Sequence, residues 1–259
     1  MDAVPDQRPG NCCNLVAEGD AVEQGADQPA SVQPASVQPA STTPSVPSRD
    51  QRERLVNRQS RFHTIPNGVD LARFTPEPEP DAQNLLFIGS FRHFPNVRAY
   101  QFFVEQVWPL LENQHPEIRT TVVAGPDPHL YWPHPSPDAR INLRGFTADV
   151  RPLYVAANLV LIPTVVSAGT NLKALEAMAM QRAIVSTSSG VAGLGLEHGR
   201  SVWIADTPHE FAAAIIRLLS DADLRATLGT NARNIAVAKY GWPALAELQT
   251  KLWRSLLVP

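Results

Sequence analysis

The feature that most constrains this chain is an alternation, from residue 61 onward, of short apolar runs with longer segments of helical periodicity. Apolar strands separated by helices are typical of a parallel sheet that is covered on both faces. The sequence therefore predicts an α/β fold with a doubly wound, Rossmann-like parallel sheet over residues 61–259. The runs of strand length are residues 85–90, 119–124, 141–145, 159–163, 183–187 and 201–205.

Helix signals lie between these runs. Val97, Tyr100 and Val104 recur at spacings of three and four residues, which predicts an amphipathic helix after the first strand. Residues 207–210, with the sequence TPHE, have the pattern of a capping box and predict the start of another helix. Further helices are expected over residues 172–180, 221–239 and 243–257.

Residues 1–60 have a different composition. Seven prolines lie in the first 50 residues, and the unit QPAS recurs at five-residue spacing between Gln28 and Ser41. Such a segment cannot bury enough apolar surface to offset the entropy lost on ordering it. The sequence therefore predicts a disordered, low-complexity tail and linker over residues 1–60. A proline-rich recognition site is disfavoured, because the proline spacing is not PxxP.

Charge and cysteine content exclude several classes of protein. Twenty-two Lys and Arg against 25 Asp and Glu leave a formal charge of −3, which gives no general attraction for nucleic acid. The two cysteines, Cys12 and Cys13, are adjacent and cannot build a disulfide framework or a metal cluster. The first residues contain no basic stretch followed by an apolar run, and no run of about 18 apolar residues occurs, so a signal peptide and a membrane span are both disfavoured. These features predict a cytoplasmic protein that binds no metal. If the protein associates with a membrane, we expect peripheral contact at its inner face.

The most informative loop follows the fourth predicted strand, because ligands of such sheets bind beyond the carboxyl ends of the strands. Residues 167–171 are small and polar, and a helix beginning near Thr170 would present free N–H groups and a positive dipole end to a phosphate. Gly169, Lys173 and Glu176 share one stripe of that helix, so a cation and a carboxylate are predicted to face one cleft. The alternative is that Lys173 and Glu176 form an i, i+3 pair at the surface.

Four short motifs then follow one another along the chain. They are residues 65–70 (IPNGVD, followed by Phe74), 87–90 (FIGS), 144–146 (RGF, followed by Val150 and Arg151) and 169–179 (GTNLKALEAMA). This series resembles the donor-binding, C-terminal half of glycosyltransferase family 4 (group 1). The resemblance implies a retaining enzyme of the two-domain GT-B architecture that uses a nucleotide-diphosphate sugar. The turn SFRHFPN and the run GTNLK are similar to those of a bacterial subgroup associated with exopolysaccharide synthesis.

The resemblance also implies roles for individual residues. Glu176 matches an acidic residue that accepts hydrogen bonds from the ribose hydroxyls of the nucleotide. Thr170 and Asn171 match a helix start whose N–H groups hold the diphosphate, and Lys173 is expected to reach a phosphate oxygen.

The implied donor site extends over the neighbouring turns. Gly89 and Ser90 match a turn that lets the backbone approach the phosphate closely, and Gly145 and Phe146 lie where relatives hold the base. The predicted donor-binding residues are Gly89, Ser90, Arg92, Gly145, Phe146, Gly169, Thr170, Asn171, Leu172, Lys173 and Glu176.

The chain departs from the family pattern in three places. Ala168 stands where the first glutamate of the E-x7-E motif is expected. Ser90 and Pro95 stand where many relatives have Arg and Lys, for which Arg92 substitutes in part. Residues 1–60 take the place of the acceptor-binding domain, and no catalytic residue is assigned.

The chain is thereby identified as a glycosyltransferase, of the hexosyltransferase type, or as the donor-binding half of one. The resemblance implies sugar transfer from a nucleotide-diphosphate sugar with retention, without a cofactor, in exopolysaccharide or cell-surface glycan synthesis. A separate acceptor-binding chain or domain is the expected partner. The alternatives are a truncated, catalytically inactive nucleotide-sugar-binding or interaction module and a sugar-nucleotide epimerase of the same architecture.

Overall fold

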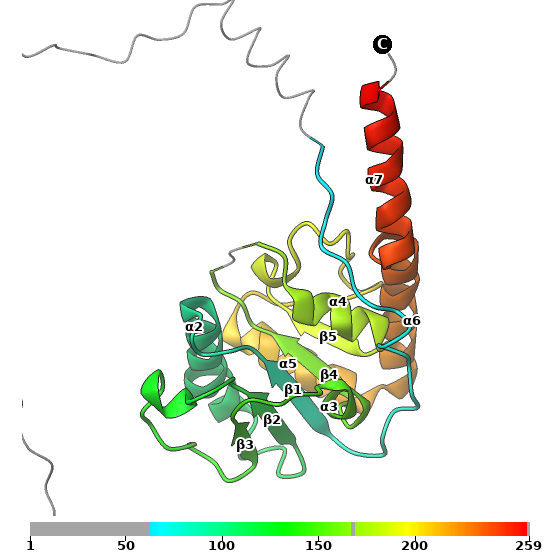
Figure 1. Ribbon diagram of the computed structural model, residues 1–259. Coiled ribbons are helices and arrows are strands. Elements are labelled where there is room, and N and C mark those ends of the chain that lie inside the picture. Colours follow the sequence, from blue (N-terminus) through cyan, green and yellow to red (C-terminus); the bar gives the residue numbers. More distant parts are fainter. Residues whose placement is uncertain (1–62, 167–168, 258–259) are drawn as a thin grey trace, which may run out of the picture. The chain divides into compact units, whose positions relative to one another are not determined.

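The computed structural model describes residues 63–166 and 169–257 (Figure 1). The tail predicted for residues 1–60 lies outside the described residues. Residues 167 and 168, in the loop before the predicted phosphate-binding helix, lie outside them too.

The core of the fold is a six-stranded sheet in the order β3-β2-β1-β4-β5-β6, and every neighbouring pair is parallel. All six predicted runs form strands, which confirms the expected doubly wound α/β fold. The last strand is shorter than predicted and comprises two residues. The strands are β1 Asn84–Ile88, β2 Arg119–Val123, β3 Ile141–Arg144, β4 Leu159–Ile162, β5 Ala183–Ser186 and β6 Trp203–Ile204.

The predicted helices are present with one departure in shape, and a short helix, α3, was not predicted. The helix after β1 starts as α2 but continues as a π-helical turn, Phe103–Val107, and a 3-10 turn, Trp108–Leu110. Pro109 lies in the 3-10 turn, where its missing backbone N–H and its clash with the carbonyl group of residue 105 prevent a regular helix from continuing. The helices are α2 Phe94–Phe102, α3 Arg151–Val155, α4 Leu172–Ala179, α5 Pro208–Ser220, α6 Ala222–Lys239 and α7 Trp242–Leu257.

The predicted capping box is present at the start of α5. The Thr207 hydroxyl accepts a hydrogen bond from the Glu210 backbone N–H, and the Glu210 carboxylate accepts one from the Thr207 N–H. This reciprocal pair fixes where the helix begins.

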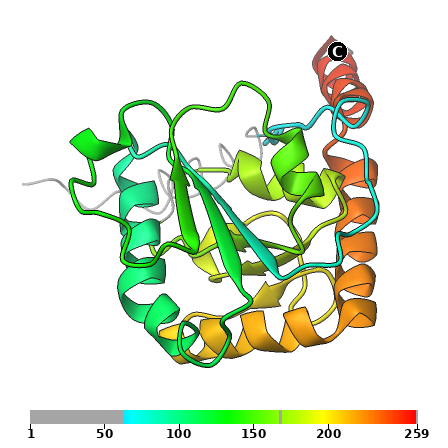
Figure 2. The ribbon, with the colours of Figure 1, turned by 90° about the horizontal axis from the view of Figure 1, so that it is seen from below.

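Helices cover the sheet on both sides (Figures 1 and 2). Leu85 and Phe87 of β1 pack into one hydrophobic cluster with side chains of α2 and α5. Leu86 packs into the other cluster, which includes side chains of α3, α4 and α6. Alternate residues of a strand point to opposite faces, so a strand with two buried faces is apolar throughout.

The strand order contains one reversal of winding, between β1 and β4. The chain leaves β1 for α2 on one face of the sheet and leaves β4 for α4 on the other face. Doubly wound folds bind ligands at this point, at the carboxyl edge of the sheet between the loops that follow the two strands, and the position is called the crevice below.

Among the residues that the structure describes, no helix combines the length and the hydrophobicity needed to cross a bilayer. Within the same ranges, no group of three or more His, Cys, Asp or Glu side chains is placed to hold a metal ion.

A buried arginine connects the segment before β1 to α3. The Arg182 guanidinium is fully buried and donates hydrogen bonds to the carbonyl oxygens of Tyr154 (2.7 Å), Val155 (3.1 Å) and Pro78 (3.2 Å). Burial lowers the pKa of Arg182, while nearby Glu79 and Glu77 oppose the shift. This side chain therefore holds the end of α3 in place.

Replacement of this arginine tests its structural role. In Arg182→Leu, three carbonyl oxygens lose their donor, so we expect the free energy of unfolding in urea to fall by about 2 kcal/mol or more. Arg200 is exposed and pairs only with Glu197 among the described residues, so Arg200→Leu is expected to change it by about 0.5 kcal/mol or less. Equal losses in the two variants would contradict this role.

Candidate functional site

The candidate site lies in the crevice between the carboxyl ends of β1 and β4. Gly89 follows β1, and a Cβ atom at this position would lie 2.6 Å from Cγ of Asn96. Glycine is therefore required at position 89 for the Asn96 side chain to lie over the end of β1. The sequence assigns Gly89 to a turn that approaches the phosphate. The contact with Asn96 is a second physical reason for a glycine at this position.

Asn96 connects the two sides of the crevice. Its Nδ2 donates a hydrogen bond to the Ser90 carbonyl oxygen at 2.9 Å, and its Oδ1 accepts one from Lys173 Nζ at 2.8 Å. Asn96 lies in the first turn of α2 and Lys173 in the first turn of α4, so this bond crosses the point where the winding reverses.

The Lys173 ammonium is held in a largely apolar setting. Nζ lies 5.5 Å from the ring centre of Phe87, a buried residue of β1. Burial lowers the pKa of Lys173 to about 8, and the negative charge of Glu176 opposes the shift. The lysine thus remains a cation at neutral pH but gives up its proton more readily than an exposed lysine.

The Glu176 carboxylate is held by a different element. The hydroxyl of Tyr154, a fully buried residue of α3, donates a hydrogen bond to Glu176 Oε2 at 2.8 Å and lies 3.2 Å from the Lys173 carbonyl oxygen. Burial raises the pKa of Glu176, while the Tyr154 hydrogen bond and the charges of Arg73 and Lys173 oppose the shift. Burial also raises the pKa of Tyr154, which keeps its hydroxyl a neutral donor.

Lys173 and Glu176 therefore have separate partners. In the described residues, the ion pairs do not include one between these two side chains. The alternative interpretation, an i, i+3 pair at the surface, is wrong because Asn96 and Tyr154 hold the two groups apart.

The loop before α4 has the predicted helix start. Gly169 has φ +86°, in the left-handed region that favours glycine, and α4 begins at Leu172 after the extended residue Asn171. Asn171 does not cap its own helix, since its side-chain amide donates to the Gly190 carbonyl oxygen at 2.6 Å. The first turn of α4, preceded by Thr170, thus lies at the crevice without a side-chain cap.

Other predicted residues lie at the same edge of the sheet but farther along it. Arg92 pairs with Asp127, which follows β2, at 3.4 Å between partly exposed side chains. Gly145 and Phe146 follow β3, and the Phe146 ring is 74% exposed. These residues are not joined to Lys173 or Glu176 by any hydrogen bond or ion pair within the described ranges, so their roles stay predictions.

Sequence reasoning missed three residues that act on Lys173 and Glu176, and these five residues are called the Lys173 cluster below. Asn96 and Tyr154 hold Lys173 and Glu176, and the exposed Arg73 contributes positive charge at Glu176. Arg73 directly precedes Phe74 of the first motif, and Tyr154 closely follows Val150 and Arg151 of the third. Their proximity to the motifs is the one signal that could have identified them.

Comparison with known proteins identifies the family. The model of the family described as "Glycosyl transferases group 1" matches residues 82–221, which include β1 to α5 and the whole Lys173 cluster except Arg73. The chain belongs to the group 1 glycosyl transferases.

Curated relatives of this chain are longer than the chain itself. A D-inositol 3-phosphate glycosyltransferase of Kineococcus radiotolerans is 29% identical over 226 residues, which cover 73% of this chain and 51% of the relative. An uncharacterized 44.6 kDa protein in the cps region of Klebsiella pneumoniae is 29% identical over 140 residues, or 51% of this chain and 36% of the relative. The chain thus spans about half the length, or less, of these relatives.

Solved structures share the fold of this chain. The C-terminal domain of the group 1 protein LpcC from Francisella tularensis is 22% identical with a TM-score of 0.56, covering 68% of this chain and all of that one. Anabaena HepE in complex with UDP-glucose is 18% identical with a TM-score of 0.58, covering 75% of this chain and 57% of that one. The predicted fold, that of the C-terminal half of a GT-B glycosyltransferase, is confirmed.

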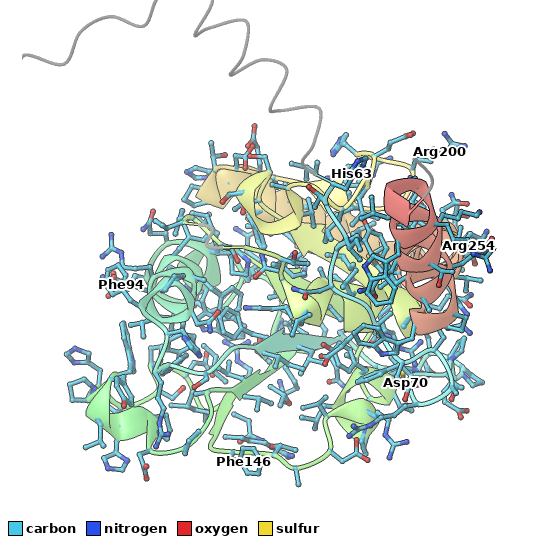
Figure 3. All side chains as sticks on the ribbon, turned by 45° about the horizontal axis from the view of Figure 1, so that its top comes forward. His63, Asp70, Phe94, Phe146, Arg200 and Arg254 are labelled. Carbon is cyan, nitrogen blue, oxygen red and sulfur yellow. The ribbon has the colours of Figure 1, made fainter. Side chains whose placement is uncertain are left out.

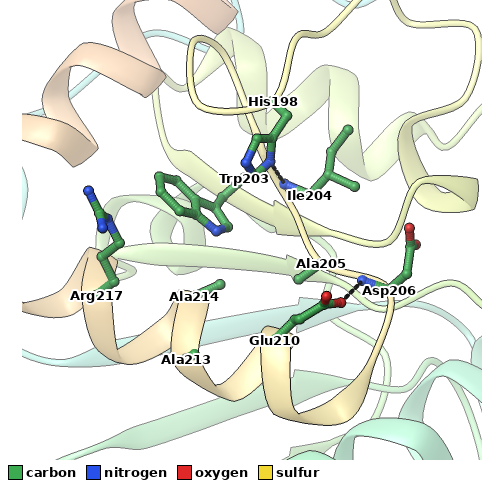
Figure 4. Close-up of a pocket in the computed structure, with 9 residues that line it drawn as sticks. All are labelled: His198, Trp203, Ile204, Ala205, Asp206, Glu210, Ala213, Ala214 and Arg217. Atoms are coloured by element: carbon green, nitrogen blue, oxygen red, sulfur yellow. Dashed lines mark hydrogen bonds between the residues drawn. The ribbon is translucent and has the colours of Figure 1, made fainter.

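A separate pocket of about 610 Å³ lies between β6 and α5 (Figure 4). Polar side chains of the pocket accept hydrogen bonds from the surrounding backbone. His198 Nδ1 accepts one from the Ile204 N–H at 3.0 Å, and the Glu210 carboxylate accepts one from the Asp206 N–H at 3.3 Å. Asp206 in turn accepts from the Ser188 N–H at 2.7 Å. This pocket shares no residue with the Lys173 cluster. The three hydrogen bonds show that His198, Glu210 and Asp206 bind backbone N–H groups around the edge strand β6.

The close contact at Gly89 can be tested by adding a single methyl group. In Gly89→Ala, the new Cβ displaces Asn96, so we expect a loss of about 1–3 kcal/mol in the free energy of unfolding. A Cβ at Gly145 would lie 3.6 Å from the nearest atom, so Gly145→Ala is the matched control, with an expected change of about 1 kcal/mol or less in either direction. Urea denaturation measures both, and equal stability of Gly89→Ala and the unmodified chain would refute the contact.

Proposed function

We propose that this chain is the donor-binding half of a glycosyltransferase and that it binds a nucleotide-diphosphate sugar in the crevice between β1 and β4. The observation that carries the proposal is the separate placement of a lysine ammonium and a glutamate carboxylate at this reversal of winding. HepE, which shares the fold, has been solved with UDP, with UDP and glucose, and with UDP-glucose, and this supports a uridine nucleotide as the first ligand to test.

Lys173 is proposed to hold the diphosphate. Its ammonium has three N–H bonds, of which Asn96 accepts one, so two remain for phosphate oxygens. As the bond between the sugar and the diphosphate breaks, negative charge grows on the leaving nucleotide. A cation held beside that charge, and partly shielded from water, stabilises the transition state more than the ground state. The uncapped start of α4 supplies further N–H groups to the same anion.

Glu176 is proposed to hold the ribose. Tyr154 donates to Oε2, and Oε1 accepts no hydrogen bond from the described side chains. A carboxylate oxygen with free lone pairs suits the vicinal hydroxyl donors of a ribose. The Tyr154 bond keeps the carboxylate oriented, so that binding does not have to order it.

The acceptor is proposed to bind to a second domain or chain. Several apolar side chains along the carboxyl edge of the sheet are exposed, among them Phe94 (66%), Phe146 (74%) and Leu172 (51%), and Figure 3 shows Phe94 and Phe146 at the outside of the ribbon. Exposed apolar surface of this kind marks interaction sites. The relatives are at least about twice as long as the matched region, which leaves room for such a domain.

The relative from a cps region supports a role in exopolysaccharide or cell-surface glycan synthesis. Transfer with retention, the absence of a cofactor and a cytoplasmic location stay predictions. The activity itself separates the proposal from an inactive binding module: sugar transfer by this chain with an acceptor-binding partner supports the proposal, and donor binding without turnover supports the module.

The Glu176 assignment can be tested with a ribose and a deoxyribose nucleotide. We expect the chain to bind UDP more tightly than 2′-deoxy-UDP in calorimetry, and Glu176→Gln to weaken UDP binding by about tenfold or more. The variant should also lose most of the preference for UDP, because a neutral amide accepts hydrogen bonds less strongly. Glu105, exposed on the π-helical turn, provides the control Glu105→Gln, which should bind as the unmodified chain does. An unchanged preference in Glu176→Gln would disprove the ribose contact.

The Lys173 assignment predicts a pH dependence. The pKa of Lys173 is lowered to about 8, so the ammonium is present below this pH and is lost as the pH rises through it. UDP affinity is therefore expected to be steady near pH 7 and to fall by up to about tenfold per unit above pH 8. In Lys173→Arg the guanidinium stays charged, so the affinity should not fall between pH 8 and 9.5. Identical profiles for both proteins would rule out Lys173 as the titrating cation.

A further inference from the structure

The Asn96 side chain has one orientation that satisfies both of its neighbours. Lys173 Nζ carries only donors and the Ser90 carbonyl oxygen is only an acceptor, so Oδ1 must face the lysine and Nδ2 the carbonyl. A flipped amide would place its NH2 group against the ammonium. Contact with Gly89 leaves no space for the side chain to withdraw toward β1. Asn96 is thus an oriented acceptor, fixed before any ligand arrives.

Lys173 has an alternative partner on its own helix. Glu176 lies one turn farther along α4, at the i, i+3 distance where a lysine and a glutamate readily pair. A lysine side chain has several rotatable bonds and reaches either partner. Such an ion pair would neutralise the cation and occupy the carboxylate, so both groups assigned to donor binding would be lost together.

We propose that Asn96 is a positioning residue that keeps the Lys173 ammonium out of an ion pair with Glu176 and directs it toward the donor diphosphate. This inference rests on the proposed function of the site. It extends that function by assigning the placement of the Lys173 ammonium to a residue in α2, which itself carries no charge. Tyr154 acts on the other member of the pair, since its hydroxyl holds Glu176 away from the lysine.

A double-mutant cycle tests the proposal with UDP as the probe and the full chain as the protein. Without Asn96 the lysine is free to pair with Glu176, so Asn96→Ala should weaken UDP binding by about fivefold or more. Lys173→Met should weaken it as well. If Asn96 acts through Lys173, the double variant should bind UDP no more weakly than Lys173→Met, within about twofold. Gln101→Ala removes another amide of α2, which bonds only Arg98 and Glu105 among the described residues, and should leave UDP binding unchanged.

Three outcomes would overturn the inference. Asn96→Ala could bind UDP as tightly as the unmodified chain, or its loss could be the same with and without Lys173, which would show that Asn96 acts independently of the lysine. If the unmodified chain binds neither UDP nor GDP, the proposed function fails and this inference fails with it. Binding by the unmodified chain, weakened by Lys173→Met but not by Asn96→Ala, rejects the inference alone.

Asn96→Asp provides a measurement for the case in which Asn96→Ala does not fold. The groups facing Lys173 are Glu176 on its own helix, Tyr154 on α3 and the uncharged Asn96 and Phe87 on α2 and β1. A carboxylate at position 96 would add a negative charge at the ammonium and favour its protonated form. The pH above which UDP binding weakens should therefore rise by about one unit or more in Asn96→Asp. An unmoved pH profile would overturn the inference, because it would show that the side chain at position 96 does not contact the Lys173 ammonium.

Discussion

The reversal of winding between β1 and β4 is the constraint on which the candidate site depends. It sends α2 and α4 to opposite faces of the sheet and leaves their first turns as neighbours across the crevice. The hydrogen bond from Lys173 to Asn96 spans that crevice and joins residues 77 positions apart in the chain. The location of the site is a property of the topology, whereas its chemistry depends on which side chains occupy the two first turns.

A line of buried polar contacts supports the carboxylate side of the site. Arg182 holds the Tyr154 carbonyl oxygen, and the Tyr154 hydroxyl holds Glu176. The same arginine bonds the Pro78 carbonyl oxygen in the segment before β1. Each of these groups would be costly to bury without a partner, so the contacts stabilise one arrangement of the carboxylate rather than several. The position of the Glu176 carboxylate is therefore fixed by contacts that reach the segment before β1, as well as by its own helix α4.

Much of the fold follows from local pattern. Strands such as β4 are apolar on both faces, and the capping box at Thr207 needs only residues that are close in sequence, so both were predictable. Lys173 and Glu176 were found for the same reason, since their spacing places them on one stripe of α4. Their partners could not be found in this way: Tyr154 is 22 positions from Glu176, and Asn96 carries no charge that would mark it. The length of β6 was overestimated from the sequence, because an apolar run does not show how many of its residues have a neighbouring strand to pair with.

The edge strand β6 shows how the sheet ends without a seventh neighbour. The His198 imidazole occupies the Ile204 N–H, a group that an additional strand would otherwise bond. Unpaired edges are where other chains add strands and begin aggregation, and natural proteins block them with side chains and by keeping the edge short. The His198 side chain therefore limits association between copies of the chain through this strand.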